Sequence, residues 1–302
     1  MASEEFYRIL QTLRQMRDSS AHLRNEFDLE YMRTTMNFNL DSVPESARIS
    51  KVDAGGVLSE WIRGCDTHPD HRMLYLHGGG YVAGGLISHR PLVARISKAS
   101  GCSILLLDYR LAPEHPFPAA LNDALSAFRW MADNGPGGQR PATRSFIAGD
   151  SAGGGLTLAT LLALIEAGDD LPDAAVTLSA WTDLALTGES IRTNAALDPI
   201  LNPRLMPDMA SAYLGGIDPR TPLASPLFGD LARFSPLLLQ VGEAEILHDD
   251  SVRFATKART AGVQVTLEIW PEMFHVWQAF SSQFPEAQEA IDRIGMFIRS
   301  FF

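Results

Sequence analysis

A serine flanked by small residues stands between two apolar stretches of the chain. The short apolar run 145–148 leads into the sequence GDSAG at residues 149–153, and a long apolar segment follows at once. This pattern predicts a strand, a sharp turn and a helix, with Ser151 at the turn. Glycines at 149 and 153 allow the strand and the helix to approach closely while the serine exposes its hydroxyl in a strained conformation. Ser151 is therefore the candidate nucleophile.

A serine hydroxyl is a weak nucleophile near neutral pH, so it needs a base within hydrogen-bonding distance and an acid that orients the base. His275 lies in a loop after the last predicted strand, where it can face the serine. The acid is expected in the loop after the preceding strand, residues 242–247, which contains Glu243 and Glu245. The order serine, acid, histidine is that of the α/β-hydrolase fold.

Acyl transfer also requires hydrogen-bond donors for the oxyanion of the tetrahedral intermediate. The amide of Ala152, directly after the nucleophile, is one candidate donor. The glycine loop 78–80 follows a compact apolar strand, and it can supply further backbone amides because no side chains block the approach. A serine turn and a glycine loop together are a far more specific signal than either one alone.

The elements that must position these groups alternate along the chain. Strands are expected at 72–76, 103–108, 145–148, 174–179, 236–241 and 264–270, and helices at 91–99, 119–132, 249–261 and 285–301. Such alternation predicts a parallel sheet with right-handed crossovers, flanked by helices, with the functional groups at the carboxyl ends of the strands. Two short alternating runs at 47–53 and 56–62 predict a hairpin at a sheet edge.

Two segments interrupt or precede this alternation. Residues 4–36 carry apolar side chains at helical spacing and predict two amphipathic helices that break near Asp18-Ser19-Ser20. We therefore divide the chain into N-terminal cap helices at 1–45, a catalytic α/β domain at 46–184 and 226–302, and a cap insertion at 185–225. Apolar side chains of the cap could form a substrate funnel or pack on the body; they are Met16, Phe27, Met206 and Met209.

Composition excludes several classes of function. The 302 residues are 46% hydrophobic and carry a net charge of −11, without a run rich in lysine or arginine, which argues against nucleic acid and anionic membrane surfaces as partners. The acidic N-terminus lacks the features of a signal peptide, and no apolar run reaches spanning length, so we expect a soluble, cytoplasmic protein without membrane insertion. Cys65 and Cys102 are expected to be free thiols.

No metal site is expected. His68 and His71 have a suitable spacing but no third ligand nearby, so they predict a solvated turn. The same interpretation applies to the remaining isolated histidines, His22, His89, His115 and His248.

The motifs together resemble the hormone-sensitive-lipase-like family of bacterial esterases, within the α/β-hydrolase fold. The resemblance covers nearly the whole chain and rests on HGGG at 77–80, DYRLAPEHPFPA at 108–119, GDSAGG at 149–154 and the loop around His275. It implies hydrolysis of short-chain carboxylic esters without a cofactor, and often a homodimer. It also implies that the amides of Gly79, Gly80 and Ala152 form the oxyanion hole and that His77 fixes the glycine loop. Asp150, beside the nucleophile, is expected to support the serine turn.

One departure from the family concerns the acid. The family uses an aspartate in an Asp-Pro-Leu context, whereas this chain has Glu245-Ile246-Leu247 at the matching position. We assign Glu245, because it retains the carboxylate at the strand end. Asp249 and Asp250 are rivals, but they open a predicted helix, where acidic residues stabilise the helix dipole. Glu243 is expected to support the site from behind.

The sequence therefore predicts a serine carboxylesterase that acts through an acyl-enzyme on Ser151, with Glu245 and His275 completing the triad. Tyr81 and Trp181 are predicted to contact the substrate, with core packing as the alternative for Trp181. Amide hydrolysis uses the same machinery and is not separated from ester hydrolysis by these residues. The alternative from another class is a non-catalytic small-molecule binding protein on the same scaffold. Such proteins typically lack the base, which is present here.

Overall fold

A computed structural model describes residues 2–19, 27–36 and 41–302. Within these residues, an eight-stranded sheet has the strand order β1-β2-β4-β3-β7-β8-β9-β10. Its strands are β1 (Arg48–Asp53), β2 (Leu58–Arg63), β3 (His68–Leu76), β4 (Cys102–Leu107), β7 (Arg144–Asp150), β8 (Ala174–Leu178), β9 (Leu237–Gly242) and β10 (Val265–Trp270). The six strands from β4 to β10 in this order pair in parallel, and β1 and β2 add an antiparallel hairpin at one edge. The predicted mostly parallel sheet and edge hairpin are confirmed.

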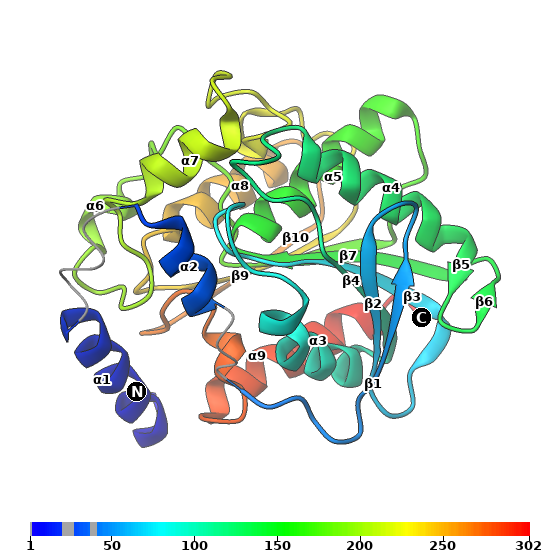
Figure 1. Ribbon diagram of the computed structural model, residues 1–302, viewed down its shortest axis with the longest axis horizontal. Coiled ribbons are helices and arrows are strands. Elements are labelled where there is room, and N and C mark those ends of the chain that lie inside the picture. The colour runs from blue at the N-terminus through cyan, green and yellow to red at the C-terminus, as the bar shows by residue number, and fades with distance from the viewer. Residues whose placement is uncertain (1, 20–26, 37–40) are drawn as a thin grey trace.

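Helices cover both faces of the sheet (Figure 1). One face carries α4 (Ala119–Asp133), α5 (Ala152–Ala167) and α8 (His248–Thr260), and the other carries α3 (Leu86–Ser100) and α9 (Pro285–Arg299). Strands such as β4 are buried on both faces, which explains their continuous apolar sequence. Residues 152–164 of α5 are buried, because the helix is apolar on all sides and packs against β7, β8 and α4. The predicted helices of the α/β domain are therefore present, with shifted ends.

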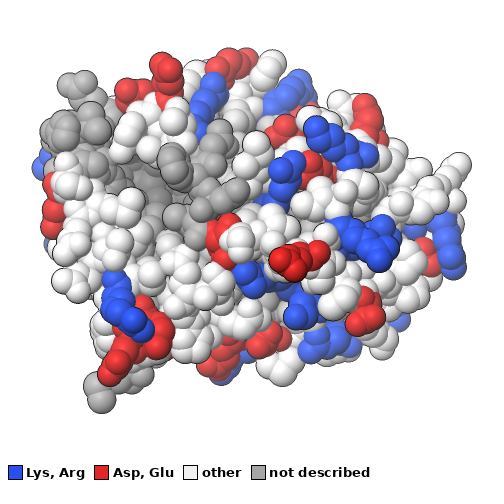
Figure 2. Space-filling view, turned by 60° about the horizontal axis from the view of Figure 1, so that its bottom comes forward, with Lys and Arg blue, Asp and Glu red and all other residues white. Residues whose placement is uncertain are grey.

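Eight further elements complete the described part of the chain. They are α1 (Glu4–Ser19), α2 (Leu29–Met36), β5 (Asn134–Gly135), β6 (Gly138–Gln139), α6 (Ser190–Thr193), α7 (Met206–Leu214), η1 (Pro226–Phe228) and η2 (Trp277–Phe280). The two predicted N-terminal helices correspond to α1 and α2, while Ser20 and His22 lie outside the described residues. In Figure 1, α2, α6 and α7 lie at the left end of the molecule. The face shown in Figure 2 carries basic and acidic side chains intermixed, without a continuous patch of one sign.

Two local predictions were wrong. The pair His68 and His71 does not form a solvated turn, because β3 begins at His68 and pairs with β4 and β7 over these residues. The turn falls earlier, at residues 65–66. The third helix begins at Leu86 rather than at Pro91, so Pro91 lies inside it. In both cases, packing against neighbouring strands extends the element beyond its local sequence signal.

The described residues contain neither a membrane-spanning helix nor a cluster of metal-binding side chains. None of their helices combines the length and the apolar character needed to cross a bilayer. No group of three or more histidine, cysteine, aspartate or glutamate side chains in 2–19, 27–36 or 41–302 is arranged so that it could hold a metal ion.

Candidate active site

Ser151 occupies the sharp turn between β7 and α5, with φ at +53° and ψ at −121°. The turn is tight because two glycines bring the backbone segments into contact. A Cβ atom at Gly153 would lie 2.0 Å from the carbonyl oxygen of Leu76, and one at Gly149 would lie 2.3 Å from the carbonyl oxygen of Gly153. Any side chain at either position would force the strand and the helix apart. The predicted strand, turn and helix are present.

The structure brings Ser151, His275 and Glu245 together. Nε2 of His275 lies 3.0 Å from Oγ of Ser151, and Nδ1 lies 2.7 Å from Oε2 of Glu245. Glu245 follows β9, and His275 lies in the loop between β10 and η2, so both come from the carboxyl ends of neighbouring parallel strands. Because a carboxylate only accepts hydrogen bonds, Nδ1 carries the proton. Nε2 is then free to accept the proton of the serine hydroxyl.

Glu245 is held by a residue that sequence analysis missed. Its Oε1 accepts hydrogen bonds from Oγ of Ser179 and from the amide of Gly242, each at 2.7 Å. Oγ of Ser179 also accepts a hydrogen bond from the amide of Val276, at 3.1 Å. Glu245 is completely buried. Ser179 therefore ties the acid to the loop that carries His275.

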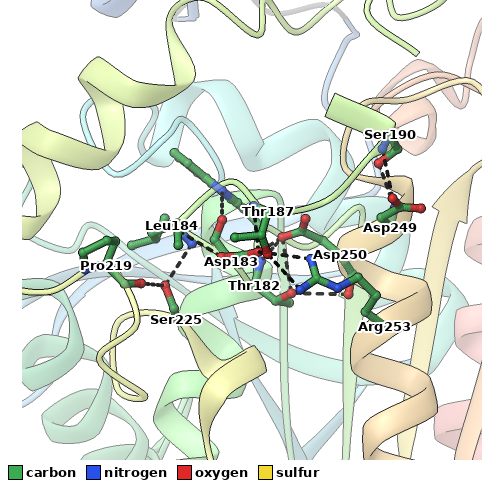
Figure 3. Close-up of polar contacts among 12 residues, drawn as sticks. Thr182, Asp183, Leu184, Thr187, Ser190, Pro219, Ser225, Asp249, Asp250 and Arg253 are labelled. Carbon is green, nitrogen blue, oxygen red and sulfur yellow. Dashed lines mark hydrogen bonds and ion pairs between the residues drawn. The ribbon is translucent and has the colours of Figure 1, made fainter. Parts of the chain in front are cut away.

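The two rival aspartates are engaged elsewhere (Figure 3). Oδ2 of Asp250 accepts hydrogen bonds from the amides of Thr182, at 2.7 Å, and Asp183, at 2.9 Å. Oδ2 of Asp249 accepts a hydrogen bond from the amide of Ser190, at 2.9 Å. Both carboxylates therefore fasten segment 182–190 to the start of α8, as expected for structural acids at a helix N-terminus.

Glu243 lies on the exposed side of the loop after β9. Its Oε2 accepts a hydrogen bond from the amide of Glu272, at 3.3 Å, in the turn that precedes His275. Glu243, predicted to support the site from behind, thus contacts the backbone of the loop that carries His275.

Burial and charge act in opposite directions on the base. Burial alone would lower the pKa of His275, but the hydrogen bond to Glu245 and the negative charges of Glu245 and Asp198 outweigh it, so the pKa is raised above 6.5. Asp198 is itself buried and accepts hydrogen bonds from the amides of Ile200 and Ile246. Burial raises the pKa of Asp198. The site therefore stabilises the imidazolium that forms when His275 takes a proton.

The glycine loop has free backbone donors beside the serine. Gly79 and Gly80 have φ values of +120° and +63°, in the region that favours glycine. No group in the described part of the chain accepts a hydrogen bond from either amide. Ala152 opens α5, where the first amides have no acceptor within the helix. Gly79 and Gly80 line the same cavity as Ser151 and His275.

Buried polar side chains form hydrogen bonds with the backbone of this loop. Oδ1 of Asp150 accepts hydrogen bonds from the hydroxyl of Tyr75, at 2.9 Å, and the amide of Gly78, at 3.2 Å. Nδ1 of His77 donates to the carbonyl of Gly78 at 2.8 Å, and its ring stacks on Tyr109. Burial lowers the pKa of His77 to about 3, so this ring is neutral. His77 and Asp150 thus have the supporting contacts that were predicted.

His89 was wrongly interpreted as a residue of a solvated turn. It is buried, and its Nε2 lies 3.4 Å from Oδ2 of Asp150 and 3.2 Å from the amide nitrogen of Gly78. The reason is the early start of α3, which places His89 within the helix and against the glycine loop.

A cavity of about 320 Å³ opens beside the serine. Trp181 lines it, whereas Tyr81 is not among its lining residues and stacks on Tyr213 with ring centroids 3.7 Å apart. Its apolar wall comes from α2 and from the segment 200–209: Tyr31, Met32, Met36, Ile200, Leu201, Leu205, Met206 and Met209. Of the four predicted funnel residues, Met206 and Met209 line the cavity. Met16 is 60% exposed, and Phe27 packs against the core without lining the cavity.

The chain is similar to known hydrolases in sequence and in fold. A family model described as alpha/beta hydrolase fold matches residues 73–279. The chain is 43% identical over 305 residues to an acetyl-hydrolase of Streptomyces hygroscopicus, and the match covers 99% of this chain and 98% of that protein.

Two solved structures share the fold throughout. The esterase EstE5, in crystals soaked with p-nitrophenyl butyrate, is 41% identical with a TM-score of 0.93, and the match covers 99% of both chains. An esterase from the bacterial hormone-sensitive lipase family is 42% identical with a TM-score of 0.91, again over 99% of both chains.

Proposed function

Since the chain belongs to the hormone-sensitive-lipase-like esterases of the α/β-hydrolase fold and is a carboxylic ester hydrolase, we propose that it cleaves short-chain esters through an acyl-enzyme on Ser151. One observation carries this proposal. The serine, histidine and glutamate side chains are linked by contacts of 3.0 and 2.7 Å, beside two glycine amides that donate to no group among the described residues. This arrangement meets the geometric requirements of nucleophilic acyl transfer.

In the first half-reaction, Oγ of Ser151 attacks the ester carbonyl carbon, and its proton passes to Nε2 of His275. The negative charge that develops on the carbonyl oxygen accepts hydrogen bonds from the amides of Gly79, Gly80 and Ala152. Glu245 stabilises the imidazolium through Nδ1. The imidazolium then protonates the leaving alkoxide oxygen, the bond from carbon to that oxygen breaks, and the acyl group remains on the serine.

In the second half-reaction, water replaces the alcohol. His275 takes a proton from the water, whose oxygen attacks the acyl carbon of the ester on Ser151. The same amides bind the second oxyanion. Collapse of this intermediate returns the proton to Oγ of Ser151 and releases the carboxylic acid, so the protein ends unchanged.

A short acyl chain is supported by the cavity and by the named relatives. The cavity of about 320 Å³ has a mostly apolar wall, which suits the acyl and alcohol portions of a small ester. The Streptomyces relative carries the name acetyl-hydrolase, and another relative, from Pseudomonas putida, is named ethyl acetate hydrolase. We assign Trp181 to substrate contact. Tyr81 does not line the cavity, and its buried ring stacks on Tyr213. Its contact with the substrate therefore stays a prediction.

We assign residues 1–45 and 185–225 to a cap over the serine. Support comes from the lining of the cavity, to which α2 and the segment 200–209 both contribute side chains. The homodimer and the cytoplasmic location stay predictions.

The test is a series of p-nitrophenyl esters, from acetate through butyrate and octanoate to palmitate, on the wild type and on Ser151→Ala. We expect turnover of the acetate and butyrate, weak turnover of the palmitate, and a loss of about 10⁶-fold in kcat when the nucleophile is removed. Wild-type activity in Ser151→Ala would rule out the acyl-enzyme. A wild type that binds these esters without cleaving them would instead support the binding-protein alternative, which no comparison favours.

A further inference from the structure

Arg33 joins the cap helix α2 to the body of the protein through hydrogen bonds. Nε of Arg33 donates to the carbonyl of Val82 at 2.9 Å, and Nη2 donates to the carbonyl of Ala112 at 3.1 Å. The same guanidinium forms a two-pronged pair with Glu114, with Nη1 to Oε1 at 2.8 Å and Nη2 to Oε2 at 2.7 Å. One planar group thus joins α2 to two separate loops of the α/β domain.

One of those loops forms the proposed oxyanion hole. The carbonyl of Gly79 accepts hydrogen bonds from the amides of Val82, at 3.1 Å, and Ala83, at 3.0 Å, which close the glycine turn. The amide of Ala112 donates to the carbonyl of Tyr81 at 3.0 Å, so the second loop braces the first. The guanidinium therefore binds the outer side of the turn whose inner side presents the amides of Gly79 and Gly80.

Among the described residues, the helix α2 has few other attachments. It has eight residues, and none of them is fully buried. Helices of this length are marginal by themselves, so their position depends on contacts with the rest of the fold. The other hydrogen bonds that residues 27–36 form with described residues lie within the segment itself, between Asp28, Tyr31, Met32 and Thr35. Its remaining attachment is apolar contact by partly buried side chains such as Met32 and Met36.

The same helix forms a wall of the substrate cavity. Tyr31, Met32, Thr35 and Met36 all line it, on the turns before and after Arg33. A shift of α2 would therefore alter the shape of the cavity. A shift of Val82 would alter the glycine turn, because the amide of Val82 donates to the carbonyl of Gly79.

We propose that Arg33 is a positioning residue that fixes the cap helix and the oxyanion turn relative to each other. The carbonyl oxygen of an ester held by the cap then lies within hydrogen-bonding distance of the oxyanion donors. This inference rests on the proposed function, because its main measurement is ester hydrolysis. A lysine at this position could not serve all of the acceptors, since its single ammonium lacks the planar fork.

The test compares Arg33→Ala, Arg33→Lys and Glu114→Gln with a matched control. The control is Arg129→Ala, which removes another surface arginine that pairs with a carboxylate, Asp169, at 2.9 Å, away from the cavity lining. For each variant, kcat and KM on p-nitrophenyl butyrate are measured together with the melting temperature. Hydrogen exchange of peptides covering 29–36 and 79–83 provides a readout that does not depend on activity.

We expect Arg33→Ala to raise KM and to lower kcat/KM by about 10- to 100-fold, because displacement of positioned groups by about 1 Å costs up to about 10²-fold. Exchange should become faster in both peptides. Glu114→Gln keeps the bonds to Val82 and Ala112, so its kcat/KM should fall less, by about threefold. Arg33→Lys should lie between these two. Arg129→Ala should match the wild type in all measurements.

Two results would overturn the inference. The first is an Arg33→Ala protein that melts earlier but keeps the wild-type KM and exchange, which would make the arginine merely structural. The second is an effect no larger than that of Arg129→Ala. If Arg33→Ala does not fold, an unchanged KM in Arg33→Lys overturns the inference equally. An inactive wild type would count against the proposed function alone, and the exchange comparison would still decide the role of Arg33.

Discussion

Replacement of Glu245 by glutamine is a sharp test because the surroundings of this side chain determine how the new amide must point. The carboxylate oxygen Oε1 accepts two hydrogen bonds, from Oγ of Ser179 and from the amide of Gly242, each at 2.7 Å. In Glu245→Gln the carbonyl oxygen is expected to take this position. The NH₂ group then faces Nδ1 of His275, where the carboxylate oxygen stood. Two donors cannot pair, so the imidazole must carry its proton on Nε2, where it cannot accept one from Ser151.

The size of the effect follows from two contributions. Turning the amide over restores the productive tautomer but sets an NH₂ group against the amide of Gly242 in a buried site, at a cost of about 1–3 kcal/mol. The carbonyl of the turned amide still accepts from Nδ1, but a hydrogen bond to a neutral acceptor is weaker than one to a carboxylate by about 1–1.5 kcal/mol. Together these amount to about 2–4.5 kcal/mol, which corresponds to a fall in kcat of about 30- to 2,000-fold.

The assay measures kcat on p-nitrophenyl butyrate for the wild type, Glu245→Gln and Asp249→Asn, with thermal melting as a check on folding. Asp249→Asn retains an oxygen that can accept from the amide of Ser190, so its kcat should stay within about threefold of the wild type. A Glu245→Gln protein that keeps kcat within about tenfold of the wild type would refute the reasoning. So would a collapse of kcat in Asp249→Asn.

Three further outcomes are expected. The pKa of His275 is raised, and only the neutral imidazole can accept a proton, so kcat/KM should increase with pH through an apparent pKa above 6.5. An apparent pKa of kcat/KM at or below 6.5 would contradict the stated balance of burial and charge. Ser179→Ala removes one donor to Glu245, so kcat on p-nitrophenyl butyrate should fall by about tenfold, and an unaltered kcat would show that the acid needs no such support. In Gly79→Ala the new Cβ would lie 2.1 Å from the carbonyl oxygen of Ala83, at a φ of +120°, so the glycine turn must shift. The kcat should therefore drop by about 10²- to 10³-fold. Steady-state kinetics that match the wild type would exclude this amide as an oxyanion donor.

Features with a local signature in the sequence were predictable. The glycines at 149 and 153 indicate a turn that only small residues permit, and the apolar runs before the serine turn and the glycine loop indicate buried strands. Glu245 could be chosen over Asp249 and Asp250 because it lies in the short loop after β9, while the rivals lie in the first turn of α8. The order of strands and helices follows from the same alternation of apolar runs with glycine and proline.

Features that depend on distant partners were not predictable. Ser179 contacts a residue 66 positions away, His89 one 61 positions away, and Arg33 one 49 positions away. A lone serine, histidine or arginine carries no pattern that reveals such a contact. Element ends were missed for a related reason: pairing and packing with neighbours extend β3 back to His68 and α3 back to Leu86.

The most direct test of the account is to identify the atom that carries the acyl group during turnover. The wild type is mixed rapidly with p-nitrophenyl butyrate, quenched in acid and analysed by peptide mass spectrometry, with Ser151→Ala as the control. The account predicts a burst of p-nitrophenol and a butyryl group on the peptide that contains Ser151, with neither in the control. Steady turnover with no acyl group on that peptide, or with the group on another residue, would contradict it.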